Sequence, residues 1–132
     1  MAKTRPVLGK VNVGGGHETP SMTNLNPIKP GSGGPSAGIR NHVQGSMEEM
    51  DQIFEPNSVT FLMSSRLRFV DVDWPKATQA AGKVVAPGGK VEMNIWCQGL
   101  EGLQVKLLFE KAGFKNVQVL GNGVGTMVHA TK

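Results

Sequence analysis

The alternation of apolar and polar residues along the first forty positions predicts two short strands and no helix. Residues 7–13 end in alternating β-branched positions and run into Gly14–Gly16, which predicts a strand followed by a turn. Thr23–Pro27 predicts a second brief extended segment that is closed by proline. The stretch 27–40 is rich in glycine, proline and serine, and we expect it to be a loop within one domain.

The middle of the chain changes to a helical period and then to a continuous apolar run. Residues 46–54 predict a helix whose capping box is formed by Ser46 and Glu49, with an apolar face of Met47, Met50 and Phe54. Residues 58–64 are almost continuously apolar, which is typical of a strand buried on both faces of a parallel sheet.

Two more helix–strand units complete the pattern. Residues 73–85 predict a helix with Pro75 in its first turn, followed by a turn at Pro87–Gly89 and an alternating strand at Lys90–Trp96. Residues 100–112 predict an amphipathic helix that ends at Gly113, with these side chains directed inward: Leu103, Leu107, Leu108 and Phe109.

The chain closes with a predicted hairpin. Its strands are residues 116–120 and 126–132, and the glycine-rich segment 121–125 joins them. Alternating strands and helices require right-handed crossovers and a mostly parallel sheet. We therefore expect residues 1–132 to form a single α/β domain with a minimal Rossmann-like sheet and an antiparallel C-terminal edge strand.

Composition and charge narrow the class of protein. The 132 residues contain one cysteine, Cys97, so the sequence excludes an intramolecular disulfide and a cysteine-based zinc site. The formal net charge is +4, but the basic residues are scattered and form no dense patch for nucleic acid. The absence of a long apolar run and of a signal-peptide pattern favours a cytoplasmic location.

The second half of the chain resembles the C-terminal part of class I S-adenosylmethionine-dependent methyltransferases. The resemblance rests on three motifs in matching order: Val84-Val-Ala-Pro-Gly-Gly-Lys90 before a strand, Lys111-Ala-Gly-Phe114 at a helix end, and the closing Val128-His-Ala-Thr-Lys132. It implies S-adenosylmethionine as cofactor. The motif of amino-group methylating enzymes, Asn or Asp followed by Pro-Pro, is absent.

The resemblance also implies a set of cofactor contacts in the first half. The segment Val11-Asn-Val-Gly-Gly-Gly-His-Glu18 corresponds to the loop that wraps the methionine part of S-adenosylmethionine. The end of the second strand corresponds to the residues that contact the ribose, and residues 44–47 correspond to those that contact the adenine. The implied cofactor-binding residues are Asn12, Gly14, Gly15, Gly16, Glu18, Asn24, Asn26, Ser46 and Met47. Asparagines stand at two positions where the family has acids, and Ser46 or Glu48 stands at the third.

The length of the first loop departs from the family. Only six residues separate Gly16 from Thr23, too few for the usual helix between the first two strands. The motifs N-V-G-G-G-x-E-x-P and T-N-L-N-P also resemble methyltransferase-like domains at the C-termini of bacterial Rhs-type polymorphic toxins. That resemblance implies a toxin effector that is delivered into the cytoplasm of a target cell. Its implied partners are a cognate immunity protein or a parent toxin polypeptide.

Candidate catalytic residues follow from position. Ser64 and Arg66 end the buried strand, where many methyltransferases meet the acceptor, and Glu18 follows the glycines. Arg66 or Arg68 is suited to hold a phosphate or carboxylate of an acceptor.

For several other polar and aromatic residues, a structural role is an alternative to a catalytic one. Asp71 and Asp73 are candidates for a general base or metal ligands, although a helix cap at Asp73 explains one of them. Trp96 is expected to pack in the core or rim, and Cys97 lacks a neighbouring histidine in the sequence.

Three functions are consistent with these residues. The first is a minimal methyltransferase-like domain that binds S-adenosylmethionine and acts by positioning donor and acceptor. The second is a degenerate Rossmann-like binding module without catalysis. The third is a toxin enzyme of another chemistry, a nuclease or an NAD-consuming enzyme, on the same sheet.

Overall fold

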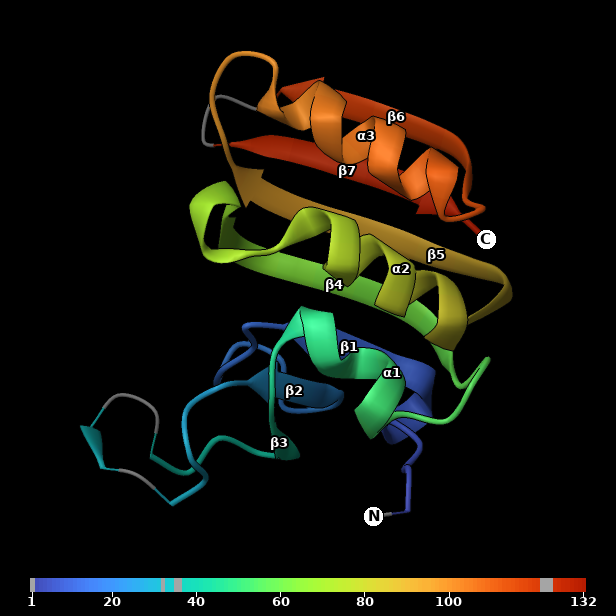
Figure 1. Ribbon diagram of the computed structural model, residues 1–132. Coiled ribbons are helices and arrows are strands. Elements are labelled where there is room, and N and C mark those ends of the chain that lie inside the picture. The colour runs from blue at the N-terminus through green and yellow to red at the C-terminus, as the bar shows by residue number, and fades with distance from the viewer. Residues whose placement is uncertain (1, 32, 35–36, 122–124) are drawn as a thin grey trace.

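A seven-stranded sheet organises the computed structural model of the chain, which describes residues 2–31, 33–34, 37–121 and 125–132. The strands lie in the order β3-β2-β1-β4-β5-β7-β6 (Figure 1). Their bounds are β1 Lys10–Val13, β2 Thr23–Asn26, β3 His42–Gln44, β4 Val59–Arg68, β5 Val85–Trp96, β6 Lys115–Gly121 and β7 Thr126–Thr131. All adjacent pairs are parallel except those that β7 makes with β5 and β6. The expected α/β, mostly parallel fold is confirmed.

The C-terminal hairpin inserts its last strand into the sheet. β7 lies between β5 and β6, so the edge strand is β6 and the antiparallel strand is internal. The predicted hairpin turn at 121–125 falls largely outside the described residues, as do residues 32, 35 and 36 of the predicted loop 27–40.

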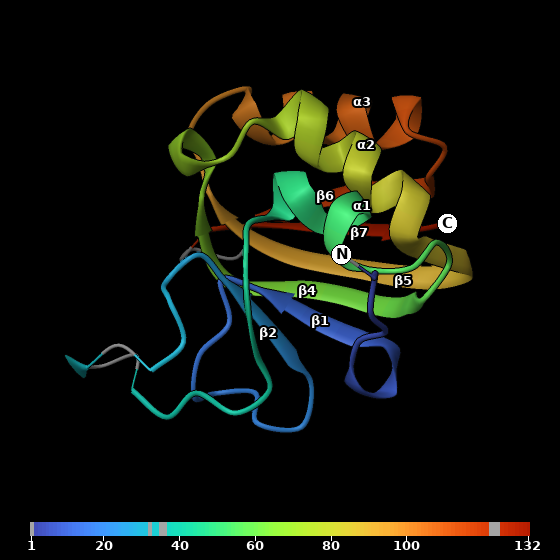
Figure 2. The same ribbon diagram turned by 60° about the horizontal axis from the view of Figure 1, so that its bottom comes forward.

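Three α-helices cover one face of this sheet. They are α1 Met50–Ile53, α2 Trp74–Val84 and α3 Glu101–Lys111, and short 3₁₀ turns lie at η1 Val7–Gly9, η3 Met47–Glu49 and η4 Phe69–Asp71. Figure 2 shows the three α-helices on the same side. In the described part of the chain, no helix covers the opposite face, and none is long and apolar enough to cross a bilayer.

The helix caps agree with the sequence prediction. The Ser46–Glu49 capping box is present, and Met47, Met50 and Phe54 are all buried. The Asp73 side chain accepts from the Lys76 amide, with Pro75 in the first turn of α2. Both helices therefore begin where local chemistry satisfies their free amides.

The central strands β4 and β5 are buried on one face only, so the prediction of a strand buried on both faces was wrong. β4 buries Val59, Leu62 and Ser64 under the helices, while Phe61 and Met63, which point to the other face, are only half-buried. β5 alternates in the same way, since Val91, Met93 and Ile95 are buried and the residues between them are more exposed. The reason is the missing second layer of helices.

Three local boundaries also differ from the sequence prediction. Residues 7–9 form a 3₁₀ turn with positive φ at Leu8 and Gly9, so β1 begins only at Lys10. β3 was not expected, because three residues give too short a pattern. β5 begins at Val85 and runs through the expected turn at Pro87–Gly89, with an irregularity in its pairing to β4.

The predicted inward face of α3 was also wrong in part. Gly102, Val105 and Phe109 are buried, whereas Leu103 and Leu107 are 47% and 57% exposed. The helix approaches the sheet along Gly102, where an added Cβ would lie 3.2 Å from Val119 and Thr126 side-chain carbons. This close approach rotates the leucines toward solvent.

Candidate functional site

The first candidate site is a cavity at the point where the strand order reverses. β1 has β2 on one side and β4 on the other, and ligands of open α/β sheets bind at the carboxyl ends of strands at such a switch point. A cavity of about 300 Å³ lies there, which we call the switch-point cavity. It is lined by Val13, Gly14, Leu25, Pro27, Gly45, Ser46, Met47, Glu48, Leu67, Asp71 and Val72.

Three of the predicted cofactor residues line the switch-point cavity: Gly14, Ser46 and Met47. Ser46 is held by its capping box, since its hydroxyl and amide both donate to Glu49 Oε1, at 2.9 and 3.1 Å. Met47 is 1% exposed and joins the core to the cavity. The neighbouring Glu48 carboxylate accepts from the Asp73 amide, which ties this segment to the start of α2.

The amides of the three glycines each donate to an acceptor within the chain. Gly14 N donates to Leu25 O at 2.7 Å and Gly15 N to Asn12 O at 3.2 Å. Gly16 N donates to Glu18 Oε1 at 2.9 Å. Each amide is therefore already satisfied within the chain.

Gly15 is required by the packing of its own loop. An added Cβ would lie 2.2 Å from Asn24 Oδ1 and 2.9 Å from the Asn12 backbone oxygen. A bulky residue at this position would disrupt the loop whether or not a ligand binds.

Two of the predicted cofactor contacts, Asn24 and Asn26, form hydrogen bonds with other segments of the chain. The Asn24 side-chain nitrogen donates to the backbone oxygens of Thr19, Met22 and Arg40, and its Oδ1 accepts from Thr19 Oγ1 at 2.5 Å. Asn26 Nδ2 donates to Gly15 O at 3.0 Å. These bonds fix the short loop that replaces the first helix of the family.

Asn12 lies beneath the same loop. Its Nδ2 donates to Thr19 Oγ1 at 2.9 Å and to Glu18 Oε2 at 3.4 Å. Its Oδ1 is buried and has no hydrogen-bond partner among the described residues. A buried acceptor without a donor costs free energy, so this atom is a site where a bound group or water would be stabilised.

The carboxyl end of β4 lies four residues beyond its predicted position. Ser64 is inside the strand, 2% exposed, and donates to Asn94 O of β5 at 2.9 Å. Ser64 therefore links two strands inside the sheet and does not lie at the end of β4, where it was predicted. A catalytic role for Ser64 stays a prediction. Arg66 and Arg68 occupy the rim, and both are exposed.

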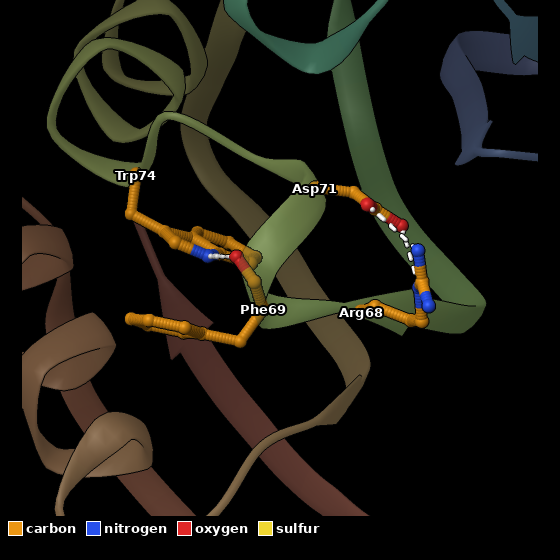
Figure 3. A network of polar contacts seen from close by, with 4 residues as sticks. All are labelled: Arg68, Phe69, Asp71 and Trp74. Carbon is orange, nitrogen blue, oxygen red and sulfur yellow. Dashed lines mark hydrogen bonds and ion pairs between the residues drawn. The ribbon is translucent and has the colours of Figure 1, made fainter.

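A bidentate ion pair follows β4. Arg68 Nε and Nη2 donate to Asp71 Oδ2 and Oδ1 at 2.8 and 3.0 Å (Figure 3). The hydrogen bond from Arg68, with a smaller contribution from its charge, lowers the pKa of Asp71 below its ordinary value. The same hydrogen bond and charge from Asp71 raise the pKa of Arg68.

Trp74 fixes the segment that carries this pair. Its Nε1 donates to Phe69 O at 2.9 Å, and its ring stacks on Phe69 with centroids 6.1 Å apart (Figure 3). The 3₁₀ turn between β4 and α2 is thereby anchored to the first residue of the helix.

A second cavity, of about 440 Å³, lies at the carboxyl ends of β4 and β5, and we call it the Trp96 cavity. It is lined by Arg68, Val70, Trp96, Cys97, Gln98, Glu101 and Gly125. Sequence reasoning assigned Trp96 to packing, yet its side chain is 43% exposed. Among the described residues, no histidine lines this cavity together with Cys97. The described residues also contain no group of three side chains that could hold a metal ion.

Comparisons with known proteins identify the fold. Phosphoethanolamine N-methyltransferase 2 from Haemonchus contortus, in complex with phosphomonomethylethanolamine and S-adenosylhomocysteine, matches with a TM-score of 0.63 and 16% identity. The match covers 91% of this chain and 35% of that one. A possible histamine N-methyltransferase from Thermotoga maritima matches with a TM-score of 0.63 and 18% identity, over 100% of this chain and 83% of that one. This chain has the fold of class I S-adenosylmethionine-dependent methyltransferases.

The likeness is one of methyltransferase fold and not of close sequence. The antibiotic-resistance methyltransferase Kmr matches with a TM-score of 0.59 at 14% identity, over 92% of this chain and 85% of that one. This chain spans about a third of the length of the Haemonchus enzyme. No family model and no curated protein sequence matches it.

Proposed function

We propose that this domain binds S-adenosylmethionine with the adenosine part in the switch-point cavity. The observation that carries the proposal is this mainly apolar cavity at the strand-order reversal of a methyltransferase fold, because that is where such sheets bind nucleotides. Its volume of about 300 Å³ suits a nucleoside rather than the whole cofactor. When bound, the cofactor supplies an electrophilic methyl group on sulfur.

The residues present fit the nucleoside half of the cofactor better than the methionine half. Leu25, Pro27 and Leu67 give the cavity apolar walls for a planar base, and Gly45 and Ser46 bring backbone close to it. The buried Asn12 Oδ1, which has no donor among the described residues, does not line this cavity and is not one of its contacts. The glycine amides, which are satisfied within the chain, are not available to a carboxylate without rearrangement of the loop.

The test is thermal unfolding of the purified domain with S-adenosylmethionine, S-adenosylhomocysteine or NAD. A ligand at about 100 times its Kd stabilises the folded state by about 2.7 kcal/mol, so a cofactor should raise Tm clearly. Leu67→Trp fills the cavity and should abolish the shift. Leu103→Trp makes the same substitution on the exposed face of α3 and should leave the shift unchanged.

The outcomes separate the three candidate functions. A shift with either S-adenosyl compound that Leu67→Trp removes supports the proposal. No shift from a well-folded protein favours a binding module without cofactor, and a shift with NAD alone favours an NAD-consuming enzyme. A shift that is equal in both tryptophan variants would mean that the ligand binds outside the switch-point cavity.

The role as an Rhs-type toxin effector stays a prediction from the sequence motifs. It implies action in a target-cell cytoplasm and a cognate immunity protein as partner. Induced expression of the chain in a bacterial cytoplasm should then arrest growth, and co-expression of the immunity protein should restore it. Unimpaired growth at a measured high level of folded protein would contradict this role.

A further inference from the structure

The Trp96 cavity is lined by an exposed indole and by Arg68, and the guanidinium of Arg66 lies over the same indole ring. Arg68 is the direct neighbour of Trp96 across the parallel β4–β5 ladder. The Arg66 guanidinium carbon lies 5.9 Å from the centroid of the Trp96 ring, within the range of a cation–π contact. A tryptophan that remains 43% exposed beside an open cavity offers a stacking surface to a planar ligand.

In the described part of the chain, the charged groups around this indole are two arginines and two carboxylates, and only Arg68 and Asp71 form an ion pair with each other. Arg68 is neutralised by the bidentate bond to Asp71. Glu101, which also lines the cavity, accepts from the Gln98 amide at 2.7 Å. Arg66 forms no ion pair within the described residues, so one positive charge beside the indole lacks an anionic partner.

We propose that the Trp96 cavity binds a planar aromatic ligand that carries one carboxylate or phosphate group, with the ring on Trp96 and the anion on Arg66. An arginine binds both groups through charge-assisted hydrogen bonds. The cavity, at about 440 Å³, is within the size range of sites for small molecules. Assigning this ligand as the methyl acceptor rests on the proposed function, whereas its binding does not.

The ligand chemistry is tested by titration calorimetry with two matched pairs of probes. 2-Naphthoate is compared with the neutral 2-naphthamide, and adenosine 5′-monophosphate with adenosine, so that a free aromatic acid and a nucleotide are distinguished. The adenosine pair is titrated into Leu67→Trp, in which the switch-point cavity is filled. In at least one pair, the anionic member should bind about tenfold more tightly. Equal affinity of anion and neutral analogue in both pairs, or no binding of any probe, would overturn the proposal.

Variants locate the bound anion. Arg66→Gln should abolish the preference for the anion, and Trp96→Ala should weaken binding of both members of the pair. Arg40→Gln, an exposed arginine beside β3 at the other edge of the sheet, removes the same charge and should change neither. An anion preference that survives Arg66→Gln would overturn the assignment.

The S-adenosylhomocysteine melting shift is measured on the same proteins. It reports on the switch-point cavity, and Arg66 does not line that cavity. A failed cofactor shift with intact naphthoate binding would reject the proposed function alone. The reverse result would reject the aromatic-anion site alone.

Discussion

At the scale of single residues, the adjacent glycines Gly14 and Gly15 are required for two different reasons. Gly14 is exposed, has φ +73° and would place an added Cβ 4.0 Å from Leu67 Cδ1, at an ordinary van der Waals distance. Gly15 is buried against Asn12 and Asn24. Gly14 is thus required only by its backbone conformation, whereas Gly15 is required by packing.

Alanine substitutions should separate these two requirements. Gly15→Ala forces Asn24 and Asn12 apart, and we expect a loss of about 1–3 kcal/mol or more in the free energy of unfolding, as for other overpacked sites. Gly14→Ala should lose about 1 kcal/mol, the cost of a left-handed conformation with a Cβ. Urea denaturation measures both, and an equal loss in the two variants would contradict the assignment.

A second prediction at this scale concerns the Arg68–Asp71 pair. Because the pKa of Asp71 is lowered in the folded protein, the pair is intact above that pKa and is lost as the pH falls through it. Carboxyl-carbon NMR should give Asp71 a lower midpoint than in the Arg68→Gln variant. Both side chains are exposed, so we expect little effect on global stability. An unchanged midpoint in Arg68→Gln would contradict the bidentate bond.

At the scale of elements, α3 differs most from its sequence pattern. Its leucines fit an amphipathic helix, but the glycine at position 102 lets a neighbouring face approach the sheet. The buried residues are then Gly102, Val105 and Phe109, spaced at three and four residues. The helical period predicts that one face of α3 is buried. Contacts with β6 and β7 determine which face that is.

Substitutions on the two faces of α3 test this orientation. Phe109→Ala should lower the free energy of unfolding by about 3–5 kcal/mol, because it opens a cavity in the core. Leu103→Gln and Leu107→Gln should each change it by about 0.5 kcal/mol or less, as expected for exposed positions. A large loss in Leu107→Gln would mean that this face is covered in solution.

At the scale of the whole molecule, the sheet has one covered face and one open face. Parallel sheets usually carry helices on both faces and have nearly continuous apolar strands. Here β5 places Lys90, Glu92, Asn94 and Trp96 on the face without helices. Since those positions are mostly polar, the sheet tolerates water where the family's remaining helices would lie.

Hydrogen exchange should reflect the unequal lengths of the strands. β4 and β5 form the longest ladder, at ten and twelve residues, whereas β1, β2 and β3 have four, four and three. Amides of β4 and β5 should therefore be the most protected, and those of β2 and β3 should exchange through local opening at lower free energy. Equal protection across the sheet would contradict this gradient.

The sequence by itself determined what depends on neighbouring residues. Periodicity and local hydrogen bonds specify the order of the α-helices and of the strands other than β3, the caps at Ser46 and Asp73, and the fold class. It also predicted the missing first helix from the six-residue loop. These features depend on contacts within a few positions of the chain, so a local pattern is sufficient to encode them.

Only the tertiary structure decided which groups face a ligand. The Gly14 amide donates to Leu25 of β2 and the Ser64 hydroxyl donates to Asn94 of β5, and both partners come from other segments of the chain. Trp96 and Arg66 come together across two strands whose residues are thirty positions apart. Such pairings depend on register and on which face is covered, and no local period in the sequence specifies either.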